Sequence, residues 1–364
     1  MISFSPSEEQ QMIINMMRQF ATDEMRKNYR QCDETGIIPR GIIGKAWDMG
    51  IIANIVPENC GGAGEERSAV TGVLLAEELA WGDLSIALEI ISPMLLAVPL
   101  ILNGTDLQKL QYLAGFCGKN PPKVTAALIE PHFNFDPNEL HTKAELKGGH
   151  YLINGRKCFV PLAAESDTLL IYAQENGKTQ GFILPKDTEG LKINPREQNM
   201  GIKALPTYEI TMGNCSIPKD HRLGGENGCD FSAILNSSKV ALAAMAVGVA
   251  RAAYEYARDY AKQRFAFGEP IASRQAIAFM LAEMAIEIDA TRLMVWEAAW
   301  KLDKKQDATK EASLGKFYAD DMVMVVTDRA IQVLGGHGYI REHPVELWFR
   351  NARGFATLDG IATV

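Results

Sequence analysis

One carboxylate stands where a helical pattern ends near the C-terminus, in the stretch RNARGFATLDG at residues 350–360. Asp359 comes directly before Gly360 and a short step after Arg353. A carboxylate can act as a general base when it lies within hydrogen-bond reach of an acidic proton. The local residues alone favour an ordinary Asp-Gly turn. A catalytic role for Asp359 therefore needs support from the rest of the chain.

A second carboxylate, Glu89, lies inside the apolar run LSIALEIISP at residues 84–93. A charge among apolar residues is costly unless it is paired or protonated. Glu89 is therefore either a helix-surface residue that faces solvent or a basic partner, or an acid/base group in a functional site. The first interpretation is the commoner one for a single Glu.

Two glycine-containing segments could approach a phosphate group. QVLGGHGY places Gly335 and Gly336 after a helical pattern, and QRFAFG places Arg264 shortly before Phe267. Two glycines after a helix usually form a C-cap. Backbone without side chains, beside an arginine, can also approach a pyrophosphate closely.

Neither a metal site nor a disulfide framework is expected. His132, Asp136 and His141 share one proline-containing loop, but their irregular spacing is a weak metal signal. The six cysteines are scattered without a CxxC pair. This usage indicates reduced thiols in a cytosolic protein.

Composition and charge exclude several classes of protein. The net charge of −8 argues against a nucleic-acid binder, which normally has a basic face. No stretch joins a basic region, an apolar run and a cleavage site into a signal peptide. No apolar run reaches the roughly 20 residues that span a bilayer. The sequence therefore predicts a cytoplasmic globular protein without a membrane span.

The first third of the chain, residues 1–122, is predicted to be a helical domain. Ser7 and Gln10 have the spacing of a capping box at the start of the first helix. Two buried helices are expected over residues 68–83 and 84–105, with an end at Asn103.

The composition changes near KNPPK, and residues 123–228 are short apolar runs between Gly, Pro and Asn turns. That alternation is typical of an antiparallel β domain. Residues 229–364 return to helical periodicity, with a first long helix expected from about Asn236. The predicted fold class is α+β, in the order helical, β, helical.

At several independent sites these segments resemble the acyl-CoA dehydrogenase family, and the resemblance covers nearly the whole chain. The family's RxxFG is similar to residues 264–268, its QxxGGxGY to residues 332–339 and its PTxEI to residues 206–210. DMGIIANIVPENCGGAG at residues 48–64 is similar to its N-terminal signature. The resemblance implies an N-terminal helical domain, a middle antiparallel β domain and a C-terminal four-helix bundle.

The resemblance further implies a homotetramer that binds FAD. In such proteins the RxxFG arginine and the QxxGG segment contact the ADP half of the FAD of a neighbouring subunit. The cofactor-binding positions that it implies here are Ile129, Phe159, Pro161, Arg264, Phe267, Gln275, Gln332, Gly335 and Gly336. A flavin split across subunits would make oligomerisation a condition of binding.

The resemblance also implies a role for Asp359. In many members RDAR…YEG carries a glutamate base, and RNARGFATLDG aligns with it without a gap, which places Asp359 at the base position. The base takes a proton from the α-carbon of an acyl-CoA thioester while a hydride leaves the β-carbon for flavin N5. A backbone N–H at the base residue can donate to the thioester carbonyl. Other members place the base at the position of Ser238, which cannot act as one.

The substrate positions that the resemblance implies are Glu89, Asp136, Leu358 and Gly360. Glu89 lies on the helix that lines the family's acyl pocket, and there it could be a second acid/base group. Aspartate is one methylene shorter than glutamate, and a shift of about 1 Å can lower a rate on the order of a hundredfold. A minority of the family acts on alicyclic thioesters with an Asp base, so a cyclic acyl group is one expectation.

One loop and two single residues depart from the family pattern. The flavin loop TEPGAGSD reads IEPHFNFDP at residues 129–137. The threonine of NGxKxWITN is Pro161, which has neither a hydroxyl nor an N–H donor. Asn351 replaces the acid of RDAR. These changes bear on flavin binding and on the shape of the substrate.

The leading prediction is an FAD-dependent enzyme that α,β-dehydrogenates, or ring-dehydrogenates, an acyl-CoA thioester. Asp359 would be its base, and the electrons would pass to an electron-transfer flavoprotein. Two alternatives stay open. The chain could be a catalytically degenerate partner subunit of a hetero-oligomeric acyl-CoA dehydrogenase. It could also be an acyl-CoA reductase or a dehydrogenase of a carrier-bound acyl group.

Overall fold

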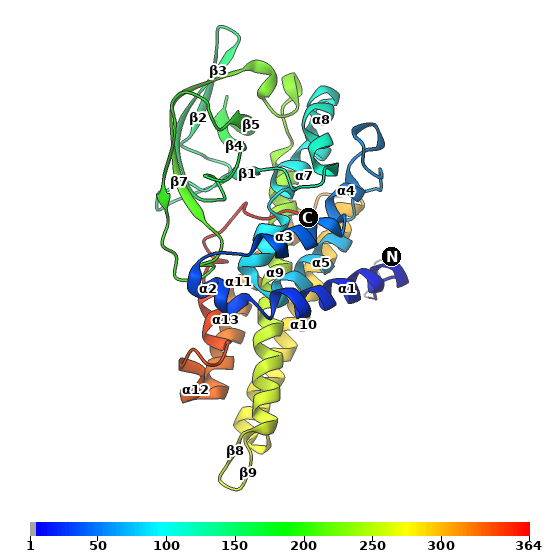
Figure 1. Cartoon of the computed structure of the whole chain (residues 1–364), viewed down its shortest axis with the longest axis vertical. Helices are drawn as coiled ribbons and strands as arrows, with labels where there is room; N and C mark the ends of the chain where they lie inside the picture. The colour runs from blue at the N-terminus through cyan, green and yellow to red at the C-terminus, as the bar shows by residue number, and fades with distance from the viewer. Residues whose placement is uncertain (1–4) are drawn as a thin grey trace.

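The computed structural model describes residues 5–364 and has three regions along the chain (Figure 1). A cluster of helices comes first, a β sheet follows, and long helices then extend away from both. The helices of the first region are α1 (Glu8–Phe20), α2 (Tyr29–Thr35), α3 (Arg40–Asp48), α4 (Ile51–Ile55), α5 (Ala69–Gly82), α6 (Leu84–Ile91), α7 (Met94–Asn103) and α8 (Asp106–Leu113). The order helical, β, helical confirms the predicted fold class. The capping box of α1 is also confirmed: Ser7 Oγ accepts the Gln10 N–H at 3.1 Å, and Gln10 Oε1 accepts the Ser7 N–H at 3.0 Å.

The single helix expected over residues 84–105 is instead two helices. α6 and α7 meet at Ser92 and Pro93 and are bent by 43°. Proline has no N–H to continue the hydrogen bonds of α6, and its ring clashes with the preceding turn. The apolar run continues across the break, which is why periodicity alone suggests one helix. α7 ends at Asn103, as expected.

The middle region is one seven-stranded sheet with the order β1-β4-β2-β3-β7-β6, and β5 pairs with β4. Its strands are β1 (Val124–Ala127), β2 (Lys143–Lys147), β3 (His150–Pro161), β4 (Thr168–Glu175), β5 (Lys178–Pro185), β6 (Leu191–Arg196) and β7 (Thr207–Pro218). The sheet is not antiparallel throughout, because β1 and β2 each pair with β4 in parallel. Parallel neighbours need a long connection, and between β1 and β4 the β2–β3 hairpin provides it.

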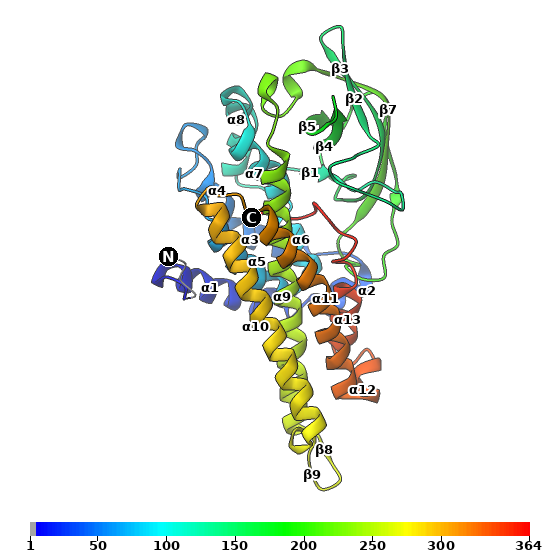
Figure 2. The same cartoon turned by 180° about the vertical axis from the view of Figure 1, so that it is seen from behind.

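The last region is an elongated helical bundle (Figure 2). It contains α9 (Phe231–Gln263), α10 (Gln275–Asp303), α11 (Thr309–Leu334), α12 (Gly336–Tyr339) and α13 (Val345–Ala352). A small hairpin, β8 (Phe265–Ala266) with β9 (Glu269–Pro270), joins α9 to α10 at the far tip. α9 begins earlier than expected, because the Asp230 side chain caps it by accepting the Ala233 N–H at 3.1 Å.

Helix α9 is the centre of the main apolar core, which the first region and the bundle share. A smaller core lies in the β sheet. α9 is long and apolar enough to cross a membrane, as are α6 and α7 if they are counted as one span. However, 89% of the most apolar window of α9 is buried inside the protein. A core helix passes the same test of length and composition.

The chain after α13 returns to the junction of the three regions (Figure 1). Thr363 Oγ1 donates to the Met94 carbonyl at 3.0 Å, and Ser237 Oγ donates to the Val364 carbonyl at 2.5 Å. Leu358 is buried. These contacts fix the backbone on both sides of Asp359.

Candidate active site

Asp359 lies on the turn after α13, and its side chain is 38% exposed. Lys316 Nζ, on α11, lies 3.5 Å from Asp359 Oδ1. The Lys316 side chain is buried. The carboxylate therefore has one cationic neighbour from the bundle and a free side toward solvent, an arrangement that leaves it able to accept a proton.

Lys316 has two further partners. It donates to Asp320 Oδ1 at 2.9 Å and Oδ2 at 2.7 Å, and to the Phe355 carbonyl at 2.9 Å. Burial raises the pKa of Asp320 to about 6; Lys316 opposes the shift and the charge of Asp359 adds to it. The spacing of Lys316 and Asp320 on one helix could have suggested their pairing. Nothing in the sequence connects either residue to Asp359.

A second lysine, Lys239 on α9, also lies beside this group. Its Nζ donates to Ser313 Oγ at 3.0 Å. Burial lowers the pKa of Lys239, an effect that the charges of Asp359 and Asp136 oppose and that of Lys316 strengthens. Asp136 is itself exposed. Asp136, a predicted substrate position, is thus close enough to share this electrostatic environment.

One base position of the resemblance lies next to the segment that carries the other. Ser238 lines a small cavity together with Gly360, the residue after Asp359, and with Leu95, Leu128 and Thr363. Ser238 Oγ is buried without a hydrogen-bond partner. Only the position at 359 carries a carboxylate.

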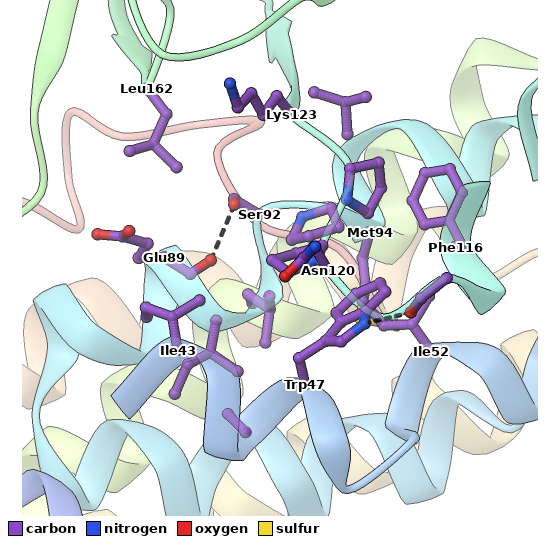
Figure 3. A pocket seen from close by; sticks show the side chains of 18 of the residues that line it. Ile43, Trp47, Ile52, Glu89, Ser92, Met94, Phe116, Asn120, Lys123 and Leu162 are labelled. Atoms are coloured by element: carbon purple, nitrogen blue, oxygen red, sulfur yellow. Dashed lines mark hydrogen bonds between the residues drawn. The ribbon is translucent and has the colours of Figure 1, made fainter. Parts of the chain in front are cut away.

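Glu89 occupies a larger cavity of about 990 Å³ between the first region and the sheet (Figure 3). Arg40 Nη1 lies 2.8 Å from Glu89 Oε1, so the buried charge is paired. Burial raises the pKa of Glu89; Arg40 opposes the shift, and Glu165 adds to it. Asp359 is not among the residues that line this cavity. The structure therefore does not bring the two predicted carboxylates into one chamber, although Met94, on the cavity wall, contacts the C-terminal segment.

The predicted flavin-ring positions lie on two paired segments. The Cys158 N–H donates to the Ile129 carbonyl at 3.0 Å. Phe159 follows with a φ of 51°, at a register shift in the pairing of β3 and β7. Such a bulge redirects a side chain out of the regular alternation. Pro161 is buried, and its carbonyl accepts a hydrogen bond from Thr125 Oγ1 at 2.5 Å.

A buried ion pair anchors the loop after Ile129. Lys157 Nζ lies 2.9 Å from Glu130 Oε1, and both side chains are almost fully inaccessible. Glu130 also accepts the backbone N–H groups of His141 at 2.6 Å and Thr142 at 2.8 Å. Burial opposes the shift, but the charge of Lys157 and these hydrogen bonds lower the pKa of Glu130 to about 2. The altered loop is therefore held at both ends.

The sequence grouped His132 and His141 with Asp136 as possible metal ligands. In the structure the carboxylate beside the two histidines is that of Glu130. Candidate ligand atoms of Glu130, His132 and His141 lie within 4.8 Å of one another. His132 Nε2 is 2.8 Å from Glu130 Oε2. The oxygens of Glu130 already accept from Lys157, His132 and two backbone N–H groups, so the carboxylate has no free position for a metal. We assign no metal here.

The glycine and arginine motifs meet at the far tip of the bundle. They line a cavity of about 710 Å³. Its lining includes Arg264, Phe267, Gln332, Gly335, Gly336, Arg274, Tyr260 and His337, and no described carboxylate. Gln275 is not in the lining but begins α10 directly after Arg274. Arg274 Nη1 pairs with Glu269 Oε1 at 3.1 Å, outside the lining, whereas Arg264 makes no ion pair with the described residues. Arg264 therefore suits an anion such as a pyrophosphate, and Arg274 would share its charge between Glu269 and the anion.

Comparisons with known proteins cover the whole fold. Three family models match: acyl-CoA dehydrogenase N-terminal domain over residues 7–120, middle domain over residues 125–215 and C-terminal domain over residues 230–364. The caffeyl-CoA reductase-Etf complex subunit CarC of Acetobacterium woodii is 36% identical over 98% of this chain and 96% of its own. A 3-(aryl)acrylate reductase of Clostridium sporogenes is 33% identical over 98% of this chain and 96% of its own. The solved butyryl-CoA dehydrogenase of Megasphaera elsdenii is 29% identical, covers 100% of this chain and 96% of that one, and has a TM-score of 0.89.

Proposed function

Because the chain belongs to the acyl-CoA dehydrogenase family of FAD-dependent flavoenzymes, we propose that it transfers hydrogen at the α,β carbon pair of an acyl-CoA thioester. Asp359 is the residue that takes up the α-proton in the oxidative direction and returns it in the reductive one. By microscopic reversibility the same group serves both directions.

The position of Asp359 carries this proposal. Its carboxylate is partly exposed, while Leu358 and Ile361 on either side are buried. The backbone is thereby fixed, and the side chain remains accessible to a substrate. A fixed backbone N–H in this turn could also donate to the thioester carbonyl and make the α-proton more acidic.

The bundle-tip cavity fits the ADP half of FAD, which when bound supplies the hydride acceptor or donor. Arg264 and Arg274 would bind the pyrophosphate, and Gly335 and Gly336 would let the backbone approach it. Gln332, Phe267 and Gln275 complete the proposed contacts. Phe267 is almost fully exposed, which leaves its ring free to contact a molecule from outside the subunit.

The flavin ring would lie elsewhere, against Ile129, Phe159 and Pro161. α9 has 33 residues and at about 1.5 Å each is about 50 Å long. Ser238, which shares a small cavity with Leu128 next to Ile129, and Tyr260, which lines the tip cavity, are 22 residues apart on α9. At about 1.5 Å per residue they are about 33 Å apart, which is longer than one extended FAD. The tip cavity of one subunit would then serve the flavin site of another.

An exposed apolar surface supports a homotetramer as the assembly. Phe279, Ile286 and Leu293 are exposed at intervals of two helical turns along α10. Leu314, Phe317 and Val325 are exposed on the neighbouring α11. Exposed apolar side chains that repeat along neighbouring helices favour an interaction site. We propose that copies of this chain cover it.

The reductive direction is a second candidate, favoured by the names of two relatives. Those proteins are a subunit of a caffeyl-CoA reductase-Etf complex and a 3-(aryl)acrylate reductase. An electron-transfer flavoprotein would then be the donor of electrons, whereas in the oxidative direction it would receive them. The cavity at Glu89 includes Trp47 and Phe116 and has room for a ring at the far end of the acyl group. In this cavity Glu89 would contact the substrate.

The test is an absorbance spectrum of the purified protein, followed by anaerobic titration. A flavin band at about 450 nm should bleach with butyryl-CoA, cyclohexanecarbonyl-CoA or 3-phenylpropanoyl-CoA. With chemically reduced flavin, cinnamoyl-CoA should restore the band if the protein is a reductase. A colourless protein that FAD does not reconstitute would overturn the proposal and leave a non-catalytic partner subunit.

A further inference from the structure

Lys316 lies between two carboxylates from different parts of the chain. Asp320 belongs to its own helix, four residues on, and Asp359 belongs to the C-terminal turn. The third partner, the Phe355 carbonyl, is in the same turn at 2.9 Å. The buried ammonium donates hydrogen bonds to Asp320 and to the Phe355 carbonyl, and Asp359 lies at ion-pair distance, 3.5 Å from it.

We propose that Lys316 is the positioning residue for Asp359, holding the turn and the orientation of its carboxylate for proton transfer at the α-carbon. This inference rests on the proposed role of Asp359 as the base. Lys316 contacts the turn at Phe355 and at Asp359, and so restrains both the backbone and the side chain. Because aspartate reaches less far than glutamate, the placement of its carboxylate depends more on such a restraint.

The charged groups around Asp359 come from two helices and one loop. Lys316 of α11 is the nearest, and Asp320 of α11, Lys239 of α9 and Asp136 share this electrostatic environment. Loss of Lys316 should lower the rate of proton transfer more than the binding of substrate, because the turn and the carboxylate lose their restraint. Loss of the Asp320 charge leaves the contacts of Lys316 with the turn in place, so it should change the rate little.

The experiment compares Lys316→Met, Lys316→Arg and Asp320→Asn holoenzymes with the unaltered protein. Lys310→Met, exposed near the start of the same helix, is the matched control. Two readouts use butyryl-CoA and 3-phenylpropanoyl-CoA as probes. One is exchange of the α-hydrogen with deuterium from the solvent, followed by mass spectrometry across pH. The other is the rate of flavin bleaching. FAD content and melting temperature show whether each variant is folded.

Lys316→Met should lower the maximal rate of exchange by roughly tenfold to a hundredfold, with little change in KM. Lys316→Arg should restore most of the rate. Asp320→Asn should stay close to the unaltered rate, because Lys316 keeps its contacts with the turn. Lys310→Met should match the unaltered protein.

Two outcomes separate failure of this inference from failure of the proposed function. If Asp359→Asn still exchanges the α-hydrogen, Asp359 is not the base, and the part of the proposed function that assigns this role to Asp359 is wrong. If Asp359→Asn is inactive while folded Lys316→Met keeps the original rate, only the positioning role is wrong. If Lys316→Met does not fold, Lys316→Gln takes its place, because it keeps an N–H donor but removes the charge near Asp359; a full rate of exchange in that variant contradicts the inference.

Discussion

Gly360 and Leu128 are in such close contact that a β-carbon at position 360 would lie 2.6 Å from Leu128 Cδ2. Gly360 also has a φ of 73°, a conformation that other residues adopt only with strain. The two residues join the turn that carries Asp359 to the end of β1. The C-terminal turn and the β domain are thus fitted to each other beside the proposed base.

Gly360→Ala should therefore displace the turn. The clash and the positive φ together should lower stability by about 1 to 3 kcal/mol and reduce the rate of α-hydrogen exchange. Gly41→Ala is the control, because no atom lies within 4 Å of the added carbon there. Thermal unfolding and exchange should be measured on both. Equal behaviour of the two variants would show that the turn tolerates a side chain.

Asp359→Asn should lower the rate of α-hydrogen exchange on the order of a thousandfold, because an amide cannot accept the proton. FAD content should not change, because Asp359 does not line the bundle-tip cavity proposed for the ADP half. Asp328→Asn, an exposed carboxylate on α11, is the control and should keep full activity. Retention of exchange by Asp359→Asn would require another base.

Local patterns were sufficient to predict much of the fold. The capping residue Ser7 and the helix end at Asn103 follow from residue types next to one another. The gathering of Arg264 with Gly335 depended on the resemblance, because nothing local connects the two segments. Pro93 was visible in the sequence, but the apolar run around it concealed the break between α6 and α7.

Contacts between distant parts of the chain could not be predicted. Glu89 pairs with Arg40, 49 residues away, and no pattern in either segment points to the other. Lys316 reaches Asp359 only because α11 and the C-terminal turn pack together. The sheet places Glu130 among the histidines of its loop, whereas proximity in sequence suggested Asp136. Such pairings depend on tertiary packing and not on spacing along the chain.

The ion pair of Glu130 and Lys157 should make the stability of the protein depend on pH in the acidic range. The pKa of Glu130 is lowered to about 2 from its ordinary value of 4.5, so its contribution is fully present above pH 4.5. That contribution is lost as the pH falls from 4.5 toward 2. In Glu130→Gln with Lys157→Met, the melting temperature should fall less steeply over this window. Parallel curves for the double variant and the unaltered protein would contradict the assignment.

Glu130→Gln alone should be far more damaging than the double variant. It leaves the buried Lys157 ammonium without its carboxylate, and breaking such a pair costs about 3 to 5 kcal/mol. Unfolding by urea should show the loss in the free energy of unfolding. A single variant as stable as the double one would mean that Lys157 finds another partner or loses its proton.

Arg264→Ala should weaken FAD binding by roughly tenfold to a hundredfold, the value of one charge-assisted hydrogen-bond donor to a phosphate. Lys262→Ala is the control, since Lys262 is exposed on the same end of α9 but does not line the cavity. FAD retained after gel filtration gives a first measure, and titration of the apoprotein gives the affinity. Similar affinities for both variants would place the ADP half elsewhere.

Disruption of the apolar surface of α10 should release the cofactor without touching its site. Ile286 is 65% exposed and lies in the stripe with Phe279 and Leu293, and it is not in the lining of the bundle-tip cavity. Ile286→Lys places a charge where subunits are proposed to meet, and burial of an unpaired charge is strongly unfavourable. The assembly should dissociate in analytical ultracentrifugation, and FAD should be lost in parallel under the proposal that each flavin is bound by two subunits.

Leu107→Lys is the matched control for this last variant, because Leu107 is 78% exposed on α8, outside the stripe. It should keep both the assembly and the cofactor. Added FAD should shift Ile286→Lys back toward the larger species, since a ligand that binds only the assembled form stabilises that form. A dissociated Ile286→Lys that holds FAD as tightly as the unaltered protein would show that one subunit contains the whole flavin site. The two-subunit arrangement inferred from the length of α9 would then be wrong.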